Sequence, residues 1–305
     1  MPVERVLIAG ATGLIGRRLA AALAGRGVEV LALTRDARRA RHAFGGSVRA
    51  LTPAELDSGG ADAGAVDAVV NLAGESLNGG RWTAERKRAI LASRVDATAR
   101  AVRFCGRAGS PPRVLVSASA VGFYGASRTA EFTEESAPAG GGFLAGVAAR
   151  WEAEALRARS FGTRVALARF GVVLAPEGGA LPRMVLPYRL GIGGPVGDGR
   201  QWMSWVHADD AVGLLIWLLE RDEQAGPVNV TAPAPVTMNE LGRAIAGATG
   251  RPHWLPAPAW GVRLLLGERA DLVLRGQRVL PQKALAGGYA FRFAEIGPAL
   301  RDLLS

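Results

Sequence analysis

The chain has 305 residues, a hydrophobic content of 49% and a formal net charge of +10 at pH 7. It contains no run of about 18 uncharged apolar residues, so a membrane-spanning helix is not expected. Cys105 is the single cysteine, which excludes an intrachain disulfide, and the first residues lack the layout of a signal peptide. These features favour a cytoplasmic protein.

The positive charge raises the question of a nucleic-acid or anionic-membrane partner. Lys87 and Lys283 are the only lysines, and the arginines are dispersed along the chain, many beside alanine or glycine in stretches such as EALRARS. No nucleic-acid recognition motif accompanies them. We therefore expect a small-molecule substrate and neither nucleic acid nor a membrane as partner; the oligomeric state is left open.

Strand-like and helix-like segments alternate through the first two thirds of the chain. This alternation predicts an α/β fold, a Rossmann-type doubly wound parallel sheet with helices on both faces, which binds ligands at the carboxyl ends of its strands. The predicted strands are residues 5–10, 28–34, 67–74, 112–120 and 163–174, and the predicted helices are 14–26, 83–107 and 143–160.

The later part of the chain differs in composition and in its pattern of predicted elements. Residues 175–205 are rich in glycine, proline and aromatic side chains, which predicts a long functional loop such as a lid or pocket wall. After residue 225 the pattern fragments into a helix near 237–249 and a mainly helical stretch over 259–305. We therefore divide the chain into a main domain, 1–224, and a smaller, mainly helical C-terminal lobe, 225–305.

A glycine motif in VLIAGATGLIG, residues 6–16, joins the first strand to the first helix. Gly10 permits the sharp turn, Gly13 lets a pyrophosphate approach the backbone, and Gly16 lets the helix pack on the strand. The helix then offers unpaired N–H groups to the phosphate. Because the motif lies between a strand and a helix, dinucleotide binding is favoured over a purely structural turn.

The end of the second predicted strand selects between cofactors. An acidic side chain there bonds a ribose 2′-hydroxyl, whereas an arginine pairs with a 2′-phosphate. The sequence LALTRD places Thr34 and Arg35 at this end, and Asp36 follows one residue late, as a helix cap would. NADP is therefore predicted, with NAD as the alternative.

Several motifs together resemble the short-chain dehydrogenase/reductase superfamily, in its extended and atypical NAD(P)-dependent epimerase/dehydratase branch. They are GATGLIG, VVNLAG, LVSASAVGFYG, LARFGVVL and WVHADDAV, and they span roughly residues 3–220. The stretches NLAGESL, SRVDAT, WEAEA and LRGQRVLPQKALAGGYAFRF are similar to a subgroup that ends in a small C-terminal domain of unknown function. That domain would cover about residues 251–298.

The resemblance implies a set of cofactor contacts. Those expected to hold the pyrophosphate are Gly10, Thr12, Gly13, Leu14, Ile15 and Gly16. Those expected at the ribose groups and along the strand ends are Thr34, Arg35, Leu72, Ala73, Gly74, Arg94, Ser117 and Ala118.

The superfamily's usual Tyr-x-x-x-Lys pair is absent. Neither lysine has a tyrosine four residues earlier, and the predicted helix over 143–160, where the pair belongs, contains no lysine. Ser119 matches the substrate-orienting serine, with a backbone bond as the alternative. Tyr124, in YGASR, is a candidate acid/base with Arg128 as its cation, although arginine cannot shuttle a proton as lysine does. The alternative is that Tyr124 only lines the pocket.

Four further residues are candidates for the substrate pocket: Glu75, Trp202, Trp205 and His207. The alternatives are burial of the glycine-rich loop for the tryptophans and a structural hydrogen bond for His207. We expect Glu152, on the helix over 143–160, to pair with a basic neighbour on the surface. No histidine or cysteine spacing indicates a metal site.

Two hypotheses of function remain. The first is an NADP-dependent oxidoreductase or epimerase acting on a small polar, sugar-like substrate. The second is a non-catalytic NADP(H)-binding sensor or regulatory module, which the missing Tyr-x-x-x-Lys pair favours.

Overall fold

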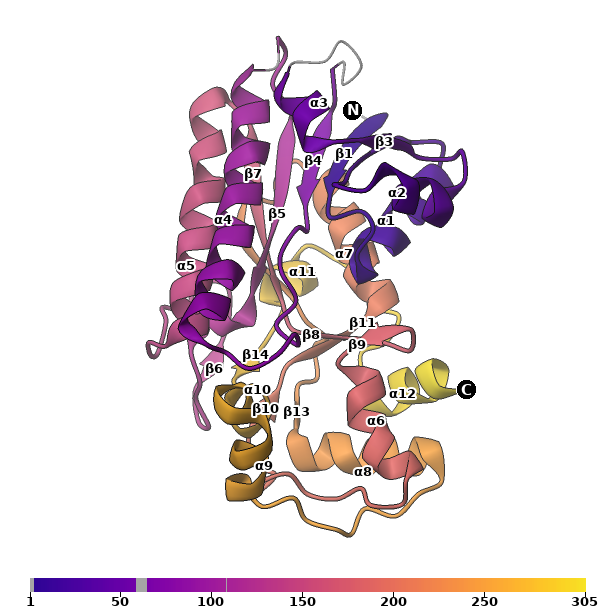
Figure 1. Cartoon of the computed structure of the whole chain (residues 1–305), viewed down its shortest axis with the longest axis vertical. Helices are drawn as coiled ribbons and strands as arrows, with labels where there is room; N and C mark the ends of the chain where they lie inside the picture. The colour runs from indigo at the N-terminus through magenta and orange to yellow at the C-terminus, as the bar shows by residue number, and fades with distance from the viewer. Residues whose placement is uncertain (1–2, 59–64, 108) are drawn as a thin grey trace.

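The computed structural model describes residues 3–58, 65–107 and 109–305. Within them, the core is a seven-stranded parallel sheet of order β12-β7-β5-β4-β1-β2-β3 (Figure 1). The strand order reverses between β1 and β4, and α/β sheets bind ligands at such a point. The strands are β1 (Arg5–Ala9), β2 (Glu29–Leu33), β3 (Arg49–Leu51), β4 (Ala68–Asn71), β5 (Val114–Ala120), β7 (Arg164–Phe170) and β12 (Gly226–Val230).

Helices cover both faces of this sheet. Figure 1 shows α4 (Ala84–Arg107) and α5 (Phe143–Leu156) on one face, and α1 (Leu14–Ala24) and α7 (Ala208–Glu220) on the other. The central strands are mostly apolar because both faces are covered; β4, for example, is buried along its whole length. Two short helices, α2 (Ala37–Phe44) and α3 (Pro53–Asp57), complete the first half. The predicted fold class is confirmed.

The stretch 175–205 is not the long loop that its composition predicted. It contains α6 (Leu181–Arg189), and strands β9 (Gly178–Gly179), β10 (Trp202–Met203) and β11 (Trp205–His207). Helix α6 forms because Leu181, Val185 and Tyr188 fall on one face and are buried together, while a proline occupies its first turn. The glycines and prolines around this helix favoured a loop in the sequence-based prediction, although the apolar residues have helical spacing.

The strand predicted over 163–174 is divided in two. β7 ends at Phe170 and β8 (Val172–Ala175) pairs with β11 in a separate small sheet. The break lies at Gly171, where a Cβ atom would stand 2.6 Å from the carbonyl oxygen of Ser204. The close approach of another segment thus turns the chain away from the main sheet.

The C-terminal part is mainly helical, as predicted. Its elements are β13 (Val236–Thr237), α8 (Met238–Thr249), α9 (Ala259–Leu266), α10 (Asp271–Leu274), β14 (Arg278–Val279), α11 (Gln282–Ala286) and α12 (Ile296–Leu304). β14 pairs with β6 (Glu131–Phe132), and the 3₁₀ helices are η1 (Val121–Tyr124), η2 (Arg157–Phe161) and η3 (Gly267–Ala270). Strand β12, which the division at 224/225 assigned to the smaller lobe, instead pairs with β7 in the main sheet.

Across the described residues, no helix combines the length and hydropathy needed to cross a bilayer.

Helix α4 buries the only cysteine, Cys105, and this burial raises the pKa of its thiol to about 11. Since the thiolate is the reactive form, we expect native protein at about pH 8 to resist an aromatic disulfide reagent. The same protein unfolded in guanidinium should react at once, and rapid labelling of the native chain would contradict this placement.

Candidate functional site

The glycine motif forms a tight cradle at the carboxyl edge of the sheet. Gly10 has a φ of +80°, and a Cβ atom there would lie 2.8 Å from the carbonyl carbon of Leu72, beyond β4. At Gly16 a Cβ atom would lie 2.2 Å from the carbonyl oxygen of Gly10. The turn is closed by a hydrogen bond from the Gly13 N–H to the Gly10 oxygen at 3.0 Å. Only glycine fits these positions because backbone fills the space.

The start of α1 suits an anion. Gly13 is its N-cap and supplies no side-chain acceptor, and the first turn, which begins at Leu14 and Ile15, carries no acidic residue. The first N–H groups therefore have no capping oxygen from Gly13. Their partial positive charge fits the pyrophosphate of a dinucleotide.

The adenosine side of the site is the turn after β2. The Thr34 N–H donates to the carbonyl oxygen of Leu51 at 2.9 Å, and the Thr34 hydroxyl accepts from the Asp36 N–H at 3.1 Å. These bonds fix the turn and leave the Arg35 side chain exposed. A guanidinium here can form paired hydrogen bonds with a phosphate dianion.

Asn71, which the sequence analysis did not single out, organises the loop after β4. Its side-chain amide donates to the Thr98 hydroxyl at 2.8 Å, and its oxygen accepts from the Ala73 N–H at 3.3 Å. The signal in the sequence that could have identified Asn71 was a polar residue at the end of an apolar strand, three residues before Gly74. The side chain fixes the path of Leu72 and Ala73 beside the glycine cradle.

Arg94 reaches this loop from α4. A Cβ atom at Gly74 would lie 3.2 Å from the Arg94 guanidinium carbon, which also stands 5.2 Å from the centre of the Trp151 ring. The guanidinium donates to the carbonyl oxygen of Ile90 at 2.9 Å, and burial lowers its pKa. The structure thus brings Arg94 and Gly74 together and sets a cation beside the loop, and the cofactor contacts expected for these two residues stay predictions.

The end of β5 lies between β4 and β7. Ser117 is paired with Asn71 and Ala118 with Ala168, so both predicted contacts stand at the same edge as the glycine cradle. Ser117 is fully buried. Their roles toward a cofactor stay predictions.

Ser119 does not bond the backbone; it joins a buried ion pair. Its hydroxyl donates to a Glu152 carboxylate oxygen at 2.6 Å. That carboxylate receives two bonds from the Arg169 guanidinium, at 2.7 and 2.8 Å. Glu152 therefore pairs with an arginine, as expected, but in the interior and not on the surface. The pair is desolvated and held by paired hydrogen bonds.

Tyr124 belongs to the same network. Its side chain is fully buried, its hydroxyl donates to the side-chain oxygen of Asn229 at 2.8 Å, and it accepts from Arg169 at 3.0 Å. Burial raises the pKa of Tyr124. Arg128, the cation suggested by the YGASR spacing, instead forms an ion pair with Asp198 at 2.7 Å. Arg169, from β7, is thus the cation beside Tyr124.

Within the part of the chain that the structure describes, no hydrogen bond, ion pair or ring contact joins any two of the four candidates for the substrate pocket. Trp205 is buried and donates its indole N–H to the Ala234 carbonyl at 3.0 Å. Trp202 is partly exposed and lies 5.0 Å from the Arg278 guanidinium. Glu75 forms an ion pair with Arg86 at 2.9 Å in the loop after β4. Trp202 and Glu75 keep exposed surface, whereas Trp205 is packed in the core.

His207 has structural partners on every side. Its Nδ1 atom accepts from the Asp209 N–H at 3.0 Å and so caps α7, and its ring stacks on Phe293 at 4.0 Å between centroids. Its Nε2 atom lies 3.3 Å from a carboxylate oxygen of Asp302 in α12. Burial lowers its pKa, which favours the neutral imidazole, although the aspartates around it act in the opposite direction. Within the described residues, no group of three or more histidine, cysteine, aspartate or glutamate side chains is arranged to hold a metal ion.

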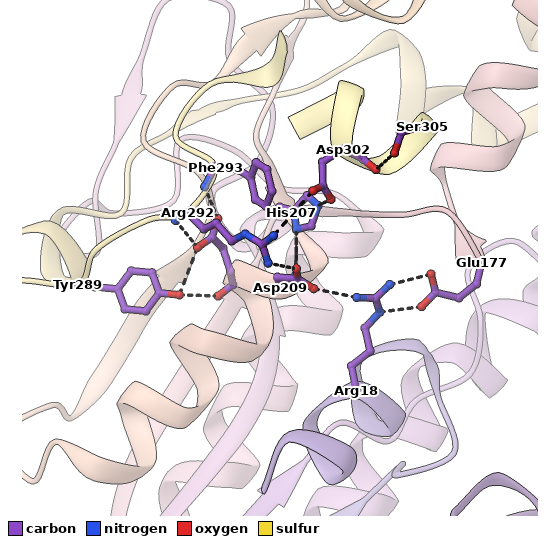
Figure 2. Close-up of polar contacts among 10 residues, drawn as sticks. Arg18, Glu177, His207, Asp209, Tyr289, Arg292, Phe293, Asp302 and Ser305 are labelled. Carbon is purple, nitrogen blue, oxygen red and sulfur yellow. Dashed lines mark hydrogen bonds and ion pairs between the residues drawn. The ribbon is translucent and has the colours of Figure 1, made fainter. Parts of the chain in front are cut away.

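The first turn of α7 ties the C-terminal segment to the main domain (Figure 2). Arg18 of α1 forms two hydrogen bonds with Glu177 and one with Asp209, which also pairs with Arg292 at 2.9 Å. The neighbouring buried Asp210 accepts the backbone N–H groups of Arg292 and Phe293 at 2.9 and 2.8 Å. The cradle helix and the C-terminal segment therefore share one electrostatic cluster.

A family model with the description NAD dependent epimerase/dehydratase family matches residues 6–231. The chain belongs to this family. A second model, a domain of unknown function, matches residues 257–303, in the C-terminal part. The predicted family and its C-terminal domain are therefore confirmed.

Similar proteins extend over the whole length. The epimerase family protein YfhF of Bacillus subtilis is 40% identical over 304 residues, covering 98% of each chain. The crystal structure of the human epimerase family protein SDR39U1, isoform 2, with NADPH has a TM-score of 0.88 at 36% identity. It covers 98% of this chain and 99% of the human one. A UDP-galactose 4-epimerase structure, at 19% identity and a TM-score of 0.75, shares the fold.

Proposed function

We propose that this protein binds NADP(H) and uses it as an oxidoreductase or epimerase on a small polar, sugar-like substrate. The observation that carries the proposal is the glycine cradle, in which a Cβ atom at Gly10 or Gly16 would clash with neighbouring backbone atoms. A human relative of 36% identity was solved with NADPH, which supports the phosphorylated cofactor. Arg35, exposed beyond β2, is the residue we assign to the 2′-phosphate.

The bound cofactor would supply the hydride acceptor or donor. Ser119 gives its only proton to Glu152, which leaves the lone pairs of its oxygen for a donor on the substrate. A substrate hydroxyl is therefore the group that Ser119 would orient. The carboxylate of Glu152, held by Arg169, fixes the Ser119 hydroxyl in this direction.

The second candidate is a non-catalytic NADP(H)-binding sensor. The burial of both candidate hydroxyls favours it, since Tyr124 is 0% and Ser119 only 2% exposed. The Tyr124 hydroxyl is also already bonded to Asn229 and Arg169. With its pKa raised by burial, this phenol is a poor proton donor near neutral pH. The enzyme and the sensor would bind the cofactor at the same site, and only the enzyme would convert a substrate.

Fluorescence titration with NADPH and NADH tests the cofactor assignment. In Arg35→Ala we expect NADPH affinity to fall by about tenfold to a hundredfold, the value of charge-assisted hydrogen bonds, while NADH affinity is unchanged. The matched control is Arg103→Ala, an exposed arginine on α4, which should alter neither. Equal weakening of both dinucleotides in Arg35→Ala would reject the phosphate contact.

Turnover separates the enzyme from the sensor. With NADP⁺ and a panel of sugar alcohols and nucleotide sugars, an oxidoreductase should give a rise in reduced nicotinamide absorbance. An epimerase returns its hydride, so it should give an isomerised sugar, detected by chromatography, with no net change in absorbance. In either case Ser119→Ala should lower turnover without weakening NADPH binding. Tight NADPH binding without turnover on any of them supports the sensor.

A further inference from the structure

Exposed apolar side chains gather in two segments of the C-terminal half. Single exposed apolar residues are ordinary, whereas a gathered set marks a surface that contacts something. Among the described residues, ten large apolar side chains are exposed, and eight of these fall within residues 181–195 or 251–266. They are Leu186, Leu190, Ile192, Trp254, Leu255, Trp260, Leu264 and Leu265, and we call them the apolar end.

Hydrogen bonds hold the two segments side by side. The Trp254 indole N–H donates to the Gly191 carbonyl at 2.9 Å, and the Leu255 N–H donates to the Gly193 carbonyl at 3.2 Å. Figure 1 shows α6, α8 and α9 at the end of the molecule opposite β3. The two segments therefore meet at these loops, and the apolar end lies remote from the N-terminal strands, with α9 as its most exposed part.

Helix α9 is the most exposed part of this surface. It contains no buried residue, and Leu264 and Leu265 are each 76% exposed. Trp260, at 72%, stands four residues before Leu264 and therefore on the same side of the helix. The described residues leave most of the surface of these three side chains uncovered, and an apolar helix face of this kind marks a contact surface.

The segments of the apolar end carry basic and no acidic side chains, while Asp198 and Glu268, directly beyond them, are paired with Arg128 and Lys87. Residues 180–197 and 241–267 contain no aspartate or glutamate, and their charged residues are Arg183, Arg189, Arg243, Arg251 and Arg263. Asp271, just beyond, is shared by Arg263 and Arg275, at 3.4 and 3.5 Å, so it neutralises only one of them. The surface thus combines exposed tryptophan and leucine with an excess of positive charge.

We propose that the apolar end docks on the surface of an anionic lipid bilayer. Tryptophan and leucine enter the interface while arginines meet the lipid phosphates, the pattern of peripheral helices. A second copy of this chain is disfavoured as the occupant because it would set these arginines against each other. The expectation of no membrane partner rested on arginines dispersed in the sequence; folding brings five of them to this end. The proposal is independent of the cofactor site.

Sedimentation of the full chain with lipid vesicles tests the proposal. We expect binding to vesicles of phosphatidylcholine mixed with phosphatidylglycerol, weakened by salt, and little binding to phosphatidylcholine alone. The double change Leu264→Gln, Leu265→Gln should lower the partition coefficient by at least about tenfold. Arg251→Gln should lower it about fivefold, the effect of one basic charge.

Matched controls keep the test specific. Leu285→Gln and Arg103→Gln alter an exposed leucine and an exposed arginine elsewhere, and should leave vesicle binding unchanged. Trp260→Gln is an independent change within the apolar end and should reproduce the loss, and NADPH affinity should be the same in every variant. Equal binding to neutral vesicles overturns the proposal. So does a dimer that the double leucine variant abolishes without any vesicle binding, or preference for single-stranded DNA over the mixed vesicles.

Discussion

Gly16→Ala should abolish measurable NADPH binding. The added Cβ atom would stand 2.2 Å from the Gly10 carbonyl oxygen and 2.8 Å from the Ala11 Cα atom, both backbone atoms that cannot rotate away. Helix α1 must then move off the turn, which displaces the N–H groups that we assign to the pyrophosphate. We expect an affinity loss of at least about a hundredfold and a lower free energy of unfolding, by about 1–3 kcal/mol, typical of overpacking.

Gly247→Ala is the matched control for this change. Gly247 lies in helix α8, and a Cβ atom there would have open space within 4 Å. Alanine should raise the free energy of unfolding by about 0.5–1 kcal/mol because it favours the helix, and NADPH affinity should stay as it is. Titration calorimetry and urea unfolding measure both quantities. Unaltered NADPH binding in Gly16→Ala would remove the cradle as the cofactor site.

Glu152→Gln should destabilise the protein by about 3–5 kcal/mol, the cost of leaving one partner of a buried ion pair alone. The amide removes the negative charge that faces Arg169, whose side chain is only 4% exposed. It also disturbs the Ser119 hydroxyl and, through Arg169, the hydroxyl of Tyr124. Urea unfolding followed by circular dichroism gives the change in free energy.

The control is an ion pair of similar geometry on the surface. Arg5 and Glu29 form two hydrogen bonds at 2.7 and 2.8 Å, but their side chains are 29% and 46% exposed. Glu29→Gln should cost no more than about 1 kcal/mol, since solvent screens the charges. If the two variants lost equal stability, burial of the Arg169–Glu152 pair would not be the source of the loss.

The cofactor cradle could be predicted from sequence because its signal is local. Three glycines at fixed spacing, a strand before them and a helix after them lie within residues 5–24, so the geometry follows from adjacent residues. The parallel sheet was predictable for a similar reason, since each strand is a short apolar run. The family resemblance then added Gly74 and Arg94, which lie outside the glycine motif, to the predicted cofactor contacts.

The chemistry at the end of β5 could not be predicted in this way. Ser119 meets Glu152 from a position 33 residues earlier, and Tyr124 meets Arg169 across 45 residues. No local pattern tells which arginine enters the core, and the YGASR spacing pointed to Arg128 instead. The Glu152 side chain reads as a surface group in sequence because burial of a carboxylate depends on a partner from another strand.

The bonds of Asp210 have a consequence for how the chain folds as it is made. Asp210 accepts N–H groups from residues 82 and 83 positions further on, so a nascent chain that stops short of Phe293 leaves this carboxylate without those donors. The hydrogen bonding at the first turn of α7 is therefore complete only once the distal segment is in place.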